Sequence, residues 1–206
     1  MPFTSNTSNR KYISFGNSSK GTMREFIKRN INGKTVLLLF ILCNIVYALM
    51  LIVTIPEIMH YSGGMKILDM MPTGYDTQYV NTLFNTLGTV GRDVYLYHQL
   101  PLDLIYPLLF GISSCLVLAF FLNQLGKLDS WLFYFCLIPL FSGFFDYCEN
   151  SGIISMLRIY PNISEFKVQI TSVFTVLKSI LTTLYFISLI ITLMALAKNK
   201  LFIRKV

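Results

Sequence analysis

Four long apolar segments constrain the fold of this chain more than any other feature of its sequence. Residues 36–55 are twenty consecutive positions without a charged side chain, and residues 104–122 are nineteen. Each segment has about the length that an α-helix needs to cross roughly 30 Å of hydrocarbon. With 54% hydrophobic residues and a mean hydropathy of +0.59, the composition is not that of a soluble globule. The sequence therefore predicts an all-α membrane protein with four transmembrane helices.

The third and fourth apolar segments each include charged residues at one end. Residues 131–145 give only fifteen mostly apolar positions, so a full crossing extends to about residue 150 and takes in Asp146 and Glu149. The last span, at about 176–197, includes Lys178. The predicted organisation is a basic flexible tail at 1–34 with a short helix at 22–31, a four-span domain at 35–197 and a second basic tail at 198–206. An outer loop occupies residues 56–103.

The positions of the basic residues predict the orientation, because Lys and Arg favour the cytoplasmic side of short loops. Seven of the seventeen lie within residues 1–34 and four within 198–206, whereas the outer loop has two against five acids. Both termini are therefore expected in the cytoplasm, where the basic residues would contact anionic lipid. These residues adjoin spans and do not form a folded basic module, so the net charge of +7 does not indicate nucleic-acid binding.

The outer loop contains a predicted amphipathic helix. Its apolar residues recur at i, i+3, i+4 and i+7, namely Val80, Leu83, Phe84 and Leu87. Asp76 or Thr77 is placed to cap its start and Gly88 to end it, and a second short helical stretch at 92–98 leads to the second span. Such helices lie on the membrane surface or cover the bundle. We expect a lid over the bundle, because the apolar stripe is narrow and a span tethers the segment at each end.

Ionisable residues at a common depth form the candidate site. At a rise of about 1.5 Å per residue from the cytoplasmic ends of the spans, acids from spans two and three share one height with a lysine from span four. A charged group in or near hydrocarbon is a functional-site candidate, since it costs several kcal/mol unless it is paired or hydrated. The candidate catalytic residues are Asp103, Asp146, Glu149 and Lys178. The candidate substrate-binding residues are Arg92, Tyr95, Tyr106 and Asn150. Pro139 with Gly143 is expected to bend the third span and open a cavity.

Several chemistries fit these residue types. Two carboxylic acids of unequal pKa serve as general acid and base, with Lys178 or Arg92 stabilising an anionic headgroup. Alternatively, carboxylate and amide oxygens hold a divalent metal ion. Neither arrangement has a diagnostic spacing, so the sequence identifies no metal and no cofactor. A purely structural ion-pair network is the third alternative.

The cysteines and histidines argue against two other membrane chemistries. Three cysteines lie in separate predicted spans and no Cys-x-x-Cys pair occurs, which argues against disulfide redox chemistry. The two histidines, His60 and His98, both lie outside the predicted spans, which argues against a haem held between transmembrane helices.

Three motifs follow one another along the chain: Gly91-Arg92 with Tyr95, Leu102-Asp103 with Tyr106-Pro107, and Asp146-Tyr147-Cys148-Glu149-Asn150. In this ordering, over roughly residues 74–178, the chain resembles a group of uncharacterised four-span integral membrane proteins. The resemblance implies that these residues form a set, and it implies no activity. The leading hypothesis is an outer-leaflet polar pocket that binds or modifies a lipid headgroup or small amphiphile. A proton- or ion-coupled transport component and a non-catalytic membrane scaffold are the alternatives.

Overall fold

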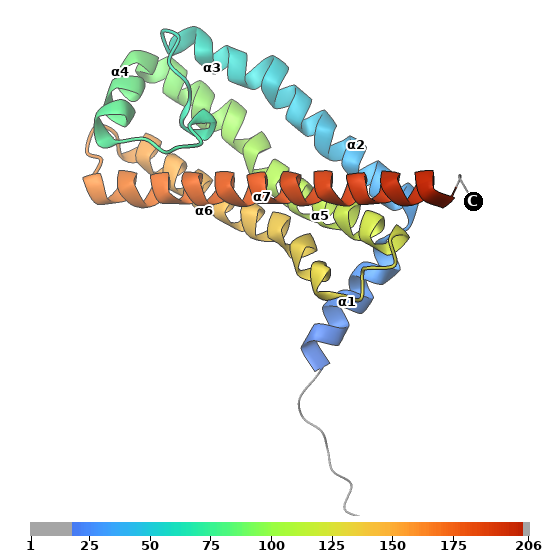
Figure 1. The fold of residues 1–206 in the computed structure, drawn as a ribbon. Helices are drawn as coiled ribbons and strands as arrows, with labels where there is room; N and C mark the ends of the chain where they lie inside the picture. Colours follow the sequence, from blue (N-terminus) through green and yellow to red (C-terminus); the bar gives the residue numbers. More distant parts are fainter. Residues whose placement is uncertain (1–17, 204–206) are drawn as a thin grey trace, which may run out of the picture.

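The computed structural model describes residues 18–203 of the chain, and every regular element within that range is helical (Figure 1). The α-helices are α1 (Ser18–Asn30), α2 (Gly33–Leu49), α3 (Ile55–Tyr61), α4 (Thr77–Val94), α5 (Leu100–Gln124), α6 (Ile138–Ile159) and α7 (Glu165–Ile203). Two π-helical segments, η1 (Met50–Thr54) and η3 (Tyr95–Gln99), and two 3-10 segments, η2 (Leu68–Met70) and η4 (Trp131–Leu137), join them.

Four continuous helical stretches are long and apolar enough to cross a membrane, as the sequence predicts. They are longer than the apolar segments that predict them, and extend over Gly33–Tyr61, Thr77–Gln124, Trp131–Ile159 and Glu165–Leu201. The extra length lies mainly at the end of the bundle that carries α3 and α4, which we call the α4 end. The opposite end carries α1 and is called the α1 end (Figure 1).

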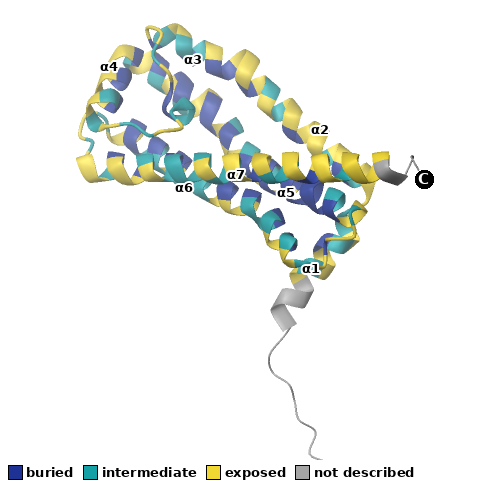
Figure 2. Ribbon diagram, viewed as in Figure 1, coloured by how far each residue is buried: buried dark blue, intermediate teal, exposed yellow. Residues whose placement is uncertain are grey.

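Helix α5 lies at the centre of the bundle. It packs against both α2 and α6, while α7 packs mainly against α6 (Figure 2). No comparable contact joins α2 to α7 within the described residues. The two helices separate toward the α4 end, and the segment that includes η2 descends between them (Figure 1). The bundle is therefore open along one side.

Glycines bring α5 and α6 close together where they cross. A Cβ atom on Gly143 would lie 2.7 Å from the carbonyl oxygen of Pro107, and one on Gly111 would lie 3.3 Å from that of Pro139. The bend at Pro139 stays a prediction, and the structure places this residue at the junction between η4 and α6. Pro139 lies in the first turn of α6, where its missing N–H is not needed, so it begins the helix after the 3-10 segment η4. The absence of a side chain at Gly143 allows the two helices to pack closely.

The outer-loop helix forms as predicted and acts as a lid. Asp76 caps the start of α4 by accepting a 2.7 Å hydrogen bond from the backbone N–H of Tyr79. Gly88 interrupts the helical geometry with φ of 63°, a conformation that glycine adopts without strain. The kink at Gly88 separates the two helical stretches that the sequence predicts, and the second leads through η3 into α5 without a loop.

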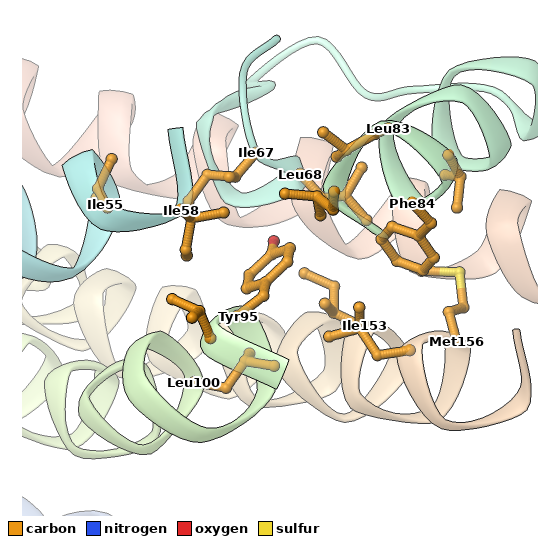
Figure 3. Close-up of a cluster of buried hydrophobic side chains, with 14 of the residues drawn as sticks. Ile55, Ile58, Ile67, Leu68, Leu83, Phe84, Tyr95, Leu100, Ile153 and Met156 are labelled. Carbon is orange, nitrogen blue, oxygen red and sulfur yellow. The ribbon is translucent and has the colours of Figure 1, made fainter. Parts of the chain in front are cut away.

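The lid is held by an apolar cluster that joins segments distant in sequence (Figure 3). All four apolar residues of the predicted stripe are buried, and Phe84 lies beside Met156 and Ile153 of α6. Tyr95 occupies the middle of this cluster, facing Leu68 of η2. Complete burial of a large apolar side chain contributes about 1.5–3 kcal/mol. These contacts favour a lid over a helix lying flat on a membrane surface.

At the α1 end, helix α1 packs against the segment before η4. Ile27 is buried, the ammonium of Lys28 lies 2.8 Å from the carboxylate of Asp129, and the guanidinium of Arg24 lies 4.7 Å from the ring centre of Phe133. The predicted tail is thus helical where it is described. Residues 1–17 lie outside the described residues.

A substitution at the α5–α6 crossing tests this packing. We expect Gly143→Ala to lower the melting temperature in detergent by several degrees, because the new methyl group overlaps a backbone oxygen and overpacking costs about 1–3 kcal/mol. Gly33→Ala is the matched control, since its methyl group would meet only the Phe120 ring at an ordinary 3.5 Å. Equal melting temperatures for the two variants would show that the crossing is loosely packed.

Candidate functional site

The candidate site centres on an ion-pair cluster between α6 and α7. The ammonium nitrogen of Lys178 lies 3.2 Å from Oδ1 of Asp146 and also contacts Oε2 of Glu149. The Lys178 side chain is 15% exposed, and that of Glu149 is completely buried. The two carboxylates are three residues apart on one face of α6, so a single ammonium group reaches both. The structure thus brings together the acidic and amino groups that the sequence places at one height.

Hydrogen bonds extend this cluster to α5 and along α7. The amide of Asn150 donates a 2.7 Å bond to the backbone carbonyl of Asp103, which links α6 to α5. The hydroxyl of Thr175 donates a 2.7 Å bond to Oε1 of Glu149. One turn away, the Ser142 and Thr182 hydroxyls lie 2.7 Å apart. Buried polar groups are costly when unpaired, so these bonds fix the positions of the ionisable side chains.

Asp103 has a different environment from the other two acids. It is only 3% exposed, and its Oδ2 atom has no hydrogen-bond partner among the described residues. Tyr106, nearly one turn along α5, stacks on Tyr47 of α2 with ring centres 5.5 Å apart. Asp103 therefore presents an acceptor atom for which the surrounding protein provides no donor.

The roof of the site comes from the segment before the lid helix. The hydroxyl of Tyr95 donates a 2.7 Å hydrogen bond to Oδ2 of Asp69, next to the fully buried Leu68. Burial raises the pKa of Asp69, and the nearby charge of Lys178 only partly offsets this effect. Asp69 is therefore a fourth carboxyl group of the site. Asp69 is not among the candidate residues predicted from the sequence, although its place between the apolar pairs 67–68 and 70–71 signals a buried acid.

Two further polar residues reach the site from the π-helical segments. The hydroxyl of Thr54 in η1 donates a hydrogen bond to Oε1 of Gln99 in η3. Gln99 is completely buried, and its Nε2 atom has no acceptor among the residues described. Gln99 lies one turn before Asp103, so an unpaired donor and an unpaired acceptor face the same region. Neither residue stands out in the sequence, because uncharged polar residues beside a span are common.

Arg92 lies outside the cluster. Its guanidinium donates a 2.8 Å hydrogen bond to the carbonyl of Phe84, which precedes the kink at Gly88, and stacks 4.6 Å from the ring centre of Tyr160. Helix ends leave carbonyl groups without helical donors, and Arg92 supplies one. Arg92 therefore supports the lid and does not reach the ion pairs.

The carboxyl groups do not form a metal centre. Within residues 18–203, no three Asp, Glu, His or Cys side chains converge in a way that could hold a metal ion. Lys178 occupies the position between Asp146 and Glu149 where a cation would bind. The geometry of the acids thus fits an internal counter-ion better than the divalent ion that the sequence left open.

A cavity of about 450 Å³ adjoins the cluster on the open side of the bundle. Its polar lining includes Asp69, Gln99, Asp103, Asp146 and Lys178, and its apolar lining includes Tyr47, Leu51, Ile55, Tyr106 and Phe110. We call this cavity the chamber. A second cavity, of about 510 Å³, lies at the α1 end between α5, η4 and α7, and no acidic residue lines it. The candidate site is therefore the chamber.

Comparisons with protein-family models, with curated proteins and with solved structures found no match for this chain. The interpretation of the chamber consequently rests on its own residues.

The ion-pair cluster predicts a large effect of removing its cation. We expect Lys178→Met to destabilise the protein by about 3–5 kcal/mol, because two buried carboxylates lose their common partner. Adding Glu149→Gln should restore part of the melting temperature, since it removes one of the uncompensated charges. Lys167→Met is the control, because Lys167 lies on the same helix and its ammonium group bonds only to the hydroxyl of Ser155 among the described residues. A Lys178→Met protein as stable as this control would contradict the assignment.

The raised pKa of Asp69 predicts a dependence of stability on pH. A carboxyl group whose pKa is higher in the folded state stabilises the fold fully below its unfolded pKa, and this contribution falls as pH rises through the folded pKa. Between about pH 4 and about pH 8, wild type should therefore lose more thermal stability than Asp69→Asn, whose side chain has no proton to lose. Asp93→Asn, at an exposed position of α4, should behave as wild type. Parallel melting curves for wild type and Asp69→Asn would exclude this role of Asp69.

Proposed function

We propose that this chain is a multi-pass membrane protein that admits a lipid or another amphiphile sideways from the bilayer and binds its headgroup in the chamber. Four helices of sufficient length and apolar character support the membrane location. Large apolar side chains are exposed along the outer faces of α2 and α7, as expected for helices in contact with acyl chains (Figure 2).

The proposed orientation places the chamber in the outer leaflet and both termini in the cytoplasm. Basic residues cluster at the α1 end, where Lys34, Lys127 and Lys198 adjoin the ends of the long helices. The buried acids lie toward the α4 end. This asymmetry agrees with the tendency of Lys and Arg to stay cytoplasmic, and it favours anionic lipid at the α1 end.

The proposal depends on a difference between the rim of the chamber, which is exposed, and its interior, which contains buried acidic side chains. At the rim, Leu51 on one wall and Thr183 on the other are exposed. In the interior, Asp103 and Asp146 are buried. Because α2 and α7 do not close over this side, an amphiphile can keep its chain among lipid tails while its headgroup enters the polar interior.

The same residues allow chemistry on the bound headgroup. Asp103 lines the chamber with a free acceptor atom and is placed to exchange a proton with a ligand. Lys178 holds Asp146 and Glu149 and is not free to bind an anionic group. In this proposal Asp103 is the candidate general base. The ion pairs of Lys178 hold α6 and α7 together on the neighbouring side of the chamber.

A transport role receives less support. Toward the α1 end, the chamber adjoins an apolar cluster that includes Phe110, Leu118, Phe133 and Tyr185. Proton or ion passage through a bundle needs polar groups or water along its path. The described core of that half offers few, so binding from the side fits the bundle better than passage through it.

Labelling with a photoreactive amphiphile tests the proposal. We expect a single-chain amphiphile with a diazirine next to its headgroup to label peptides that contain Tyr47, Ile55 and Lys178, as mapped by mass spectrometry. Leu51→Trp narrows the rim and should reduce this labelling by about tenfold, the effect of losing about 1.4 kcal/mol of binding.

Ile52→Trp is the matched control for that variant. Ile52 is the neighbouring residue, is 75% exposed and does not line the chamber, so its substitution should leave the labelling unchanged. Labelling spread evenly along the outer faces of α2 and α7, and insensitive to Leu51→Trp, would refute access through this side.

A further inference from the structure

The charge balance of the chamber indicates which headgroups it accepts. The carboxyl groups of four residues lie in or beside the chamber, namely Asp69, Asp103, Asp146 and Glu149. Among the residues described, only Lys178 provides a cation within ion-pair distance of any of them. Lys178 contacts Asp146 and Glu149, which leaves Asp69 and Asp103 without a cationic partner in the described chain. An anionic headgroup would find no free cation here, whereas an ammonium group would find two carboxyl groups that have no cationic partner.

The unpaired atoms indicate the same kind of ligand independently of the charge count. Oδ2 of Asp103 lacks a donor and Nε2 of Gln99 lacks an acceptor, and both side chains are almost completely buried and line the chamber. A buried donor or acceptor without a partner costs about 1–3 kcal/mol, more for a charged group. A ligand that donates to Asp103 and accepts from Gln99 removes both penalties at once.

The aromatic lining suits a cation beside these acids. Tyr106 stacks on Tyr47 and lies 5.7 Å from the ring centre of Phe110, so three aromatic rings form one wall of the chamber. Aromatic faces attract ammonium groups through their quadrupoles. The volume of about 450 Å³ exceeds the needs of a bare ion.

We propose that the chamber binds an amphiphile whose headgroup carries a protonated amine with a hydroxyl or other oxygen acceptor next to it. The ammonium lies between Asp103 and Asp69 and donates to Asp103, while the neighbouring oxygen accepts from Gln99. The chain leaves through the gap between α2 and α7. This inference rests on the proposed function and specifies its ligand class as long-chain amino alcohols and other long-chain amines with an adjacent oxygen.

Competition with the photoreactive amphiphile tests the preference. The competitors are three compounds with the same twelve-carbon chain: a long-chain amino alcohol, the corresponding diol and dodecyl phosphate. In wild-type protein reconstituted in neutral lipid, we expect the amino alcohol to compete at a concentration about tenfold lower than the diol, from one charge-assisted hydrogen bond. Dodecyl phosphate should compete least.

Two variants connect the preference to the residues. Asp103→Asn should remove most of the advantage that the amino alcohol has over the diol. In wild type the amino alcohol should also compete better than a fourth competitor, dodecylamine, which has no oxygen acceptor, and Gln99→Leu should remove that advantage. Asp93→Asn is the control and should reproduce wild type, because Asp93 is exposed on α4 away from the chamber lining.

The possible outcomes separate this inference from the proposed function. Labelling confined to the chamber with equal competition by all three compounds would leave the proposed function standing and overturn the preference for amines. Strongest competition by dodecyl phosphate would overturn it as well. Labelling that no competitor reduces and that lies outside the chamber would refute both. The competitor series in wild type decides the charge preference even if a variant does not fold.

Discussion

The contact of one lysine with two carboxylates determines how the rest of this bundle is arranged. Lys178 projects from α7 toward Asp146 and Glu149 of α6, and all three side chains are largely buried. Removing such charges from water is costly, and close pairing with additional hydrogen bonds offsets that cost. The hydrogen bond from Asn150 to the backbone of Asp103 then positions α5 against the same pair of helices. Helix α2 takes no part in this network, which explains why the bundle remains open beside it.

The η2 segment, which packs beneath the lid, covers these interactions from one side. Tyr95 connects the lid to the site, because its ring lies in the apolar cluster while its hydroxyl bonds to Asp69 (Figure 3). Electrostatic interactions strengthen where the surroundings are apolar, and unpaired groups become more costly there. The same covering that stabilises the Lys178 cluster therefore makes the unpaired atoms of Asp103 and Gln99 costly. In the proposed function, a bound ligand relieves that cost.

Regular periodicity explains which features the sequence predicts well. The helical rise is constant, so Asp146, Glu149 and Lys178 are correctly placed at one height, and the spacing of apolar residues identifies the buried face of α4. Asp69 was missed because it lies in an irregular segment, where no period relates it to the other acids. The contact between Thr54 and Gln99 depends on two π-helical segments that the sequence does not signal. Arg92 was misplaced because its partners lie in a preceding turn of α4 and at the end of α6, and no spacing reveals this.

The π-helical segment η3 has a consequence for the whole of α5. A π turn accommodates one residue more than an α turn, and each residue of an α-helix advances by about 100° around the axis. Tyr95 to Gln99 therefore rotate everything that follows relative to the lid helix before them. With this extra residue, Tyr95 faces the lid cluster while Asp103 faces the interior of the chamber. A helix without this extra residue would turn Asp103 away from the chamber while Tyr95 kept its place, so the position of the acid depends on the number of residues in η3.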